Sequence, residues 1–148
     1  MSNDAAVTKD LIKVLEDGRD GFATAADKLE ADGEPELATT FRQRGQQRGA
    51  FADELQALAA SYGDQIEESG TVAAAVHRGW LIVKDAIAGS DPKGVLDAAE
   101  QGEDHAVSAF RKAVADDLST ELRTVVERQQ AEVLAAHNQI KALRDARS

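Results

Sequence analysis

Four carboxylates in the second half of the chain have a spacing that could bind a metal. Glu100, Glu103 and Asp104 lie close together, and Glu132 lies near the middle of a later segment with helical periodicity. Residues three or four apart share one face of a helix, so these carboxylates could converge on one ion. Carboxylates alone favour hard cations or iron over zinc. These four residues define the alternative hypothesis, an atypical metal site.

A typical di-iron bundle needs more than carboxylates. It supplies a Glu from each of two helices and a Glu-x-x-His pair from each of the other two. The chain contains no Glu-x-x-His sequence, and its histidines are His77, His105 and His137. Gly18, and no carboxylate, is the inward-facing residue at the middle of the first helical segment. We therefore expect surface or flanking histidines, no ferroxidase activity, no catalytic residues and no cofactor.

Charged and polar side chains also occupy the centres of the apolar stripes. Arg48 is near the centre of its stripe with Arg44 one turn away, Glu103 and Gln129 are central in theirs, and Glu132 lies near a stripe edge. These five residues are predicted to form a structural polar layer. In it, Arg48 would donate to Glu103, and also to Glu132 or Gln129, without a metal between them. The alternative is that the long side chains extend out of the bundle to solvent.

The composition limits the class of protein. The 148 residues predict one domain (1–148) with a core of its own, and a net charge of -10 disfavours nucleic acid and anionic lipid. There is no cysteine, so disulfides and cysteine-based zinc sites are excluded. No apolar run approaches the length of a membrane span, and the N-terminus lacks the features of a signal peptide. We expect a cytoplasmic location and no membrane contact.

Apolar residues that recur every three or four positions predict five helices, over about 4–31, 35–62, 71–88, 91–115 and 119–147. Short turns after Asp32-Gly33 and around Asp116 make two antiparallel hairpins. The predicted caps are Ser2 or Asn3 and Ser119 for the first and last helices. The predicted fold is all-α: a ferritin-like four-helix bundle of two antiparallel hairpins joined by a long crossover that contains the additional helix.

Short sequences along the chain also resemble a known family. LEDGRDGF, FADELQ, HRGW, GED and AHNQIKALRD follow one another in this order. They resemble the bacterial family called domain of unknown function 2383, whose members are placed among ferritin-like four-helix bundles. HRGW and GED are the most distinctive of these sequences. The resemblance implies the fold, and it implies no activity because the family has no established biochemical function.

Three functional hypotheses follow from these patterns. The first is a non-enzymatic bundle that acts through protein contacts or under stress, and the second is the carboxylate metal site. The third is a small-molecule site beside Trp80 on the predicted crossover helix, where Leu81 and Ile82 add apolar surface. The same surface predicts a homodimer with Trp80 or its neighbours at or near the interface.

Overall fold

The computed structural model describes residues 3–62 and 91–147. Its helices are α1 (Asp4–Ala31), α2 (Pro35–Tyr62), α4 (Pro92–Ala115) and α5 (Thr120–Asp145). No strand occurs in these two ranges, so the all-α prediction is confirmed for them. The helix predicted over 71–88, and with it Trp80, lies outside the described residues. None of the described helices is long and apolar enough to cross a lipid bilayer.

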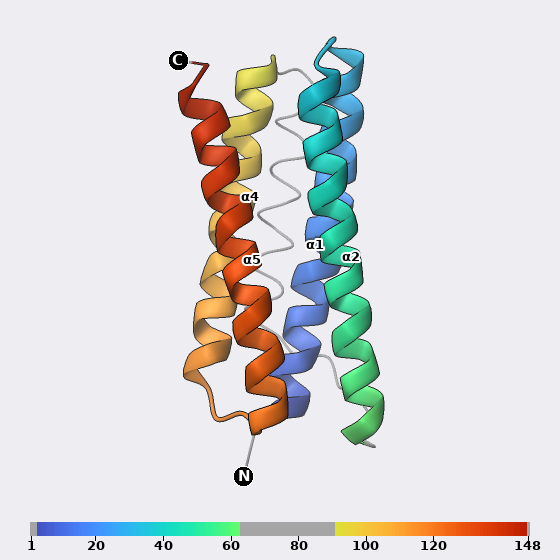
Figure 1. Cartoon of the computed structure of the whole chain (residues 1–148), viewed down its shortest axis with the longest axis vertical. Helices are drawn as coiled ribbons and strands as arrows, with labels where there is room; N and C mark the ends of the chain where they lie inside the picture. The colour runs from blue at the N-terminus through green and yellow to red at the C-terminus, as the bar shows by residue number, and fades with distance from the viewer. Residues whose placement is uncertain (1–2, 63–90, 148) are drawn as a thin grey trace.

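The four helices form a bundle of two antiparallel hairpins, α1 with α2 and α4 with α5 (Figure 1). Between the hairpins, α1 lies beside α4 and α2 lies beside α5. Helix α2 ends at one end of the bundle, and α4 begins at the opposite end (Figure 1). Helices α2 and α4 therefore run in the same direction, which separates this topology from a simple up-down-up-down bundle.

The first hairpin turns on a single residue with left-handed backbone geometry. Gly33 has φ 81°, and its N–H donates to the Glu30 carbonyl at 3.1 Å. The next N–H, that of Glu34, donates to the Leu29 carbonyl at 2.9 Å. Glycine takes this conformation without a steric penalty from Cβ. Pro35 then begins α2, as the sequence predicts.

In the second hairpin, a side chain caps the N-terminus of each helix, α4 and α5. Asp91 Oδ1 accepts from the Gly94 N–H at 2.9 Å, and Ser119 Oγ accepts from the Leu122 N–H at 3.4 Å. Helix α5 begins at Thr120 and ends at Asp145, slightly inside the predicted range. A difference of one or two residues is normal where terminal turns fray.

Of the two predicted caps of α1, Ser2 lies outside the described residues, and Asn3 is in the predicted position without the expected capping bond. Its Nδ2 donates instead to Asp116 Oδ1 at 2.6 Å, and its backbone N–H donates to the Asp117 carbonyl at 2.7 Å. A tertiary partner therefore replaces the local one, and the start of α1 is joined to the turn between α4 and α5.

The core runs along the whole bundle axis. Its largest fully buried apolar side chains come from all four helices and are Leu11, Leu15, Phe22, Leu29, Phe41, Leu55, Leu96, Phe110, Leu122 and Ile140. Phe22 and Phe41 meet edge to face, with ring centroids 5.5 Å apart. This arrangement adds to the stabilisation from burial alone.

The Asn3–Asp116 bond predicts a pH dependence of stability. The bond from Asn3, followed by the one from the Asp117 N–H, lowers the pKa of Asp116 below its ordinary value. The stabilisation is therefore present above the pKa of the unfolded carboxyl, and it is lost as the pH falls through the lower folded pKa. We expect Asn3→Ala to reduce the urea midpoint at about pH 7 and to have a much smaller effect at about pH 2.

Asp116→Asn provides the control, because an amide keeps an acceptor for Asn3 but does not titrate. In that background the effect of Asn3→Ala should be nearly the same at both pH values. An equally large effect of Asn3→Ala at both pH values in the parent chain would show that Asp116 is not the group responsible.

Candidate functional site

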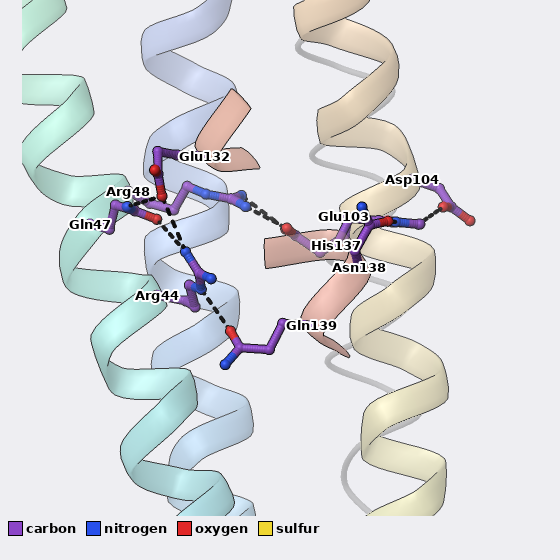
Figure 2. Close-up of polar contacts among 9 residues, drawn as sticks. All are labelled: Arg44, Gln47, Arg48, Glu103, Asp104, Glu132, His137, Asn138 and Gln139. Atoms are coloured by element: carbon purple, nitrogen blue, oxygen red, sulfur yellow. Dashed lines mark hydrogen bonds and ion pairs between the residues drawn. The ribbon is translucent and has the colours of Figure 1, made fainter. Parts of the chain in front are cut away.

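An ion pair is buried at the middle of the bundle, between α2 and α4. Arg48 Nη1 donates to Glu103 Oε1 at 2.9 Å, and Nη2 donates to Oε2, which makes the contact bidentate (Figure 2). Both side chains are 0% exposed. Arg48 is the largest fully buried side chain among the described residues. A planar guanidinium matches a carboxylate in this geometry and offsets much of the cost of burying two charges.

Helix α1 also packs against the guanidinium, through Phe22 and Gly18. The Cζ atom of Arg48 lies 5.2 Å from the centre of the Phe22 ring, so the cation faces the electron-rich side of an aromatic group. A Cβ placed on Gly18 would lie 3.0 Å from Arg48 Nη1 and 3.5 Å from its Cγ. The absence of a side chain at Gly18 therefore leaves the volume that Arg48 occupies.

The geometry limits what Glu103 can do chemically. Both of its oxygens accept from the same guanidinium, and the side chain has no exposed surface. A general base or metal ligand needs a lone pair directed at a proton or an ion. As it stands, the pair joins two helices, and the carboxylate is closed off from solvent.

The neutral member of the predicted layer belongs to a different contact. Gln129 on α5 is fully buried, and its Nε2 donates to the Phe51 carbonyl at 3.3 Å and to Glu54 Oε1 at 2.9 Å. Arg128 Nη2 also donates to Glu54. The prediction that Arg48 also donates to Gln129 or Glu132 is wrong, because both bonds from the Arg48 terminal nitrogens go to Glu103.

The remaining two members of the predicted layer lie nearer the surface. Arg44 Nε donates to Gln139 Oε1 at 2.9 Å, and its Nη1 lies 3.6 Å from Glu132 Oε2 (Figure 2). Gln47 Nε2 donates to the same Glu132 oxygen at 3.1 Å. The Glu132 side chain is 48% exposed, which agrees with its position at the edge of its stripe. These contacts join α2 to α5 outside the core.

The structure does not bring the four candidate metal ligands together. Glu103 and Glu132 are bonded as described, and Glu100 accepts from Arg144 Nη1. Asp104 Oδ1 lies 2.6 Å from His137 Nε2 on the surface (Figure 2). Among residues 3–62 and 91–147, no group of three or more His, Cys, Asp or Glu residues could hold a metal ion.

Sequence reasoning missed five residues that complete these contacts, namely Gln47, Glu54, Arg128, Gln139 and Arg144. Each lies beside an apolar stripe, where a polar residue is ordinary and gives no signal. The available signal is the position of Gln129 at the centre of its apolar stripe, because an amide buried there requires hydrogen-bond partners. Its side chain indicates that a partner exists on α2 without indicating which residue supplies it.

Comparison with known proteins identifies a family. The sequence profile of the family described as Domain of unknown function (DUF2383) matches residues 5–116. The matched range covers α1 except for its first residue, and all of α2 and α4. It therefore contains both Arg48 and Glu103, and it ends before α5. A search of curated proteins found no match.

Gly18→Ala tests the fit between α1 and the ion pair. The guanidinium is held by Glu103, so the shift of a few tenths of an ångström that the added Cβ requires would strain the bidentate contact. Overpacking typically costs about 1–3 kcal/mol, which exceeds the gain of up to about 1 kcal/mol from helix propensity. We expect a lower free energy of unfolding, measured with urea.

Gly49→Ala is the matched control in the same hairpin. The nearest atom to its added Cβ would be Cδ of Arg19 at 3.3 Å, and the Arg19 side chain is 46% exposed and free to shift. This substitution should be neutral or stabilising. If the two substitutions had equal effects, close packing against Arg48 would not explain Gly18.

Proposed function

The chain belongs to the family of domain of unknown function DUF2383, and we propose that it is a non-enzymatic, ferritin-like helical bundle that acts through contacts with other proteins. The ferritin-like assignment is supported by the directions of the helices. Two antiparallel hairpins in which α2 and α4 run the same way have the connectivity of bundles with one long crossover (Figure 1).

The observation that carries the proposal is the ion pair. In ferritin-like di-metal proteins, carboxylates from facing helices surround cations at the middle of the bundle. Here a guanidinium from α2 meets the carboxylate from α4 at that level, with Phe22 and Gly18 beside it. The Arg48 guanidinium thus supplies the positive charge at the level where di-metal proteins bind their cations. A centre of this kind supports a scaffold more readily than a reaction.

The first experiment asks whether the centre has any chemistry. The parent chain and the Arg48→Met/Glu103→Leu variant are purified without a chelator, and their metal content and iron(II) oxidation are measured. We expect neither protein to retain stoichiometric metal, and both to oxidise iron no faster than buffer. Near-stoichiometric iron or manganese in the parent, lost in the variant, would overturn the proposal and favour the carboxylate site.

The second experiment asks for contacts inside the cell. A photo-crosslinking amino acid is placed at one exposed position on each of three helices, Gln56, Gln101 and Asn138. A bundle that works through protein contacts should give a reproducible crosslinked product from one helix and not from all three. The absence of any product from all three positions would contradict the proposal. The stress association expected from the sequence stays a prediction, which expression under stress would test.

A further inference from the structure

The outer face of α5 has an unusual surface for so charged a chain. Leu134 is 44% exposed and is the exposed large hydrophobic side chain among the described residues. Its exposed neighbours on that face, Ala131, Ala135 and Asn138, are short and uncharged. A single exposed leucine is ordinary on a protein surface. Leu134 differs from an ordinary exposed leucine in the charged residues that lie on either side of it.

Opposite charges lie at equal distances on either side of Leu134. Glu127 is seven residues before it and Lys141 is seven residues after it, and both are exposed. Seven residues are close to two helical turns, so the three side chains follow one line along α5. The line reads acidic, apolar, basic, with the apolar residue at its midpoint.

The line of Glu127, Leu134 and Lys141 is complementary in charge to a second copy of the same line that runs in the opposite direction. We propose that the outer face of α5 binds a second copy of this chain, with the two α5 helices antiparallel about a two-fold axis at Leu134. Leu134 then packs on the partner's Leu134, and Glu127 of each copy lies level with Lys141 of the other. An isologous two-fold contact requires this kind of self-complementary patch.

The charges also select the direction of pairing. In a parallel arrangement the two Glu127 side chains would face each other, as would the two Lys141 side chains, and both pairs would repel. In the antiparallel arrangement both pairs attract. The intramolecular partner of Glu127, Arg123, is a weak competitor, because the separation is 3.9 Å and both terminal nitrogens of Arg123 already donate to the Val114 and Asp116 carbonyls.

The occupant is therefore a second copy, since an unrelated protein would give no reason for this symmetry. The inference goes beyond the proposed function, which leaves the partner open, and does not depend on it. It involves residues of α5 and none of the residues named in the prediction around Trp80.

Cysteine crosslinking tests the geometry directly, because the chain has no cysteine of its own. Leu134→Cys is oxidised, or treated with a short bismaleimide, at micromolar protein concentration. We expect a covalent dimer in high yield. The controls are Gln101→Cys on α4 and Ala57→Cys on α2, both exposed positions, which should give little dimer. Equal yields at the three positions would overturn the proposal.

Charge reversal tests the pairing without a crosslink. Glu127→Lys and Lys141→Glu each replace two attractive pairs by two repulsive ones, and each should raise the dimer dissociation constant about tenfold in sedimentation equilibrium. The double variant restores both pairs in reverse and should recover the parent value. A monomeric parent chain, or a double variant no better than the single ones, would overturn the proposal. Circular dichroism checks that all variants remain helical.

Discussion

Arg48→Ala is expected to lower the free energy of unfolding by about 3–5 kcal/mol. Most of the lost stability comes from Glu103, which stays buried after Arg48 is truncated. Glu103 is 0% exposed and both of its oxygens accept from the guanidinium, so truncation leaves a buried carboxylate without its donors. The contact between Arg48 and the Phe22 ring is lost as well. Urea unfolding followed by circular dichroism measures the change.

Two comparisons separate the buried pair from arginine removal in general. Arg147→Ala removes a guanidinium that bonds to Glu34 at the end of the bundle, where both side chains are partly exposed, and should cost less than about 1 kcal/mol. Arg48→Met with Glu103→Leu replaces the pair by apolar groups of similar volume and should recover much of the loss. If Arg48→Ala unfolded at the parent midpoint, the pair would contribute nothing to folding.

The helices and their turns could be predicted from the sequence because their signals are local. Apolar periodicity, the Asp32-Gly33 turn and the position of Pro35 each act within a few residues. The role of Asn3 could not be predicted in this way. Its partner, Asp116, is distant in sequence, and the competing capping bond would have been a local one.

The ion pair could be predicted because a charge in the centre of an apolar stripe must find an opposite charge at the same level. Arg48 and Glu103 are such residues, and they face each other across the bundle. The wider network could not be predicted, because Glu132 lies near a stripe edge. There a rotation of a few degrees decides between core and surface, and the structure places Glu132 48% exposed.

The α1–α2 contact and the α2–α5 contact are built in different ways. Helices α1 and α2 approach closely at Gly45, where an added Cβ would lie 3.2 Å from Phe22 Cβ and 3.4 Å from the Arg19 carbonyl. Helices α2 and α5 are instead joined by long polar side chains, among them Gln129 and Glu54. The α2–α5 contact therefore depends on hydrogen bonds more than on backbone proximity, and it should be sensitive to charge.

Gln129→Glu tests this dependence and is expected to cost about 3 kcal/mol or more at neutral pH. The introduced carboxylate would be fully buried, and it would face the Phe51 carbonyl and the Glu54 carboxylate, both of which accept from the present amide. Two donated bonds would become two repulsive contacts. Gln129→Met, which removes the bonds without adding charge, should cost only about 1–2 kcal/mol.

The loss from Gln129→Glu should also depend on pH in a defined direction. Burial and the Glu54 charge should raise the pKa of the introduced carboxyl above the value of about 4.3 that it has in the unfolded chain. The folded state then binds the proton more tightly, so the deficit relative to the parent is complete above the raised pKa and shrinks as the pH falls through it. Gln129→Met should show no such recovery. Urea midpoints of both variants between about pH 8 and about pH 5 measure this, and a constant deficit for Gln129→Glu would mean that its carboxylate has moved to solvent.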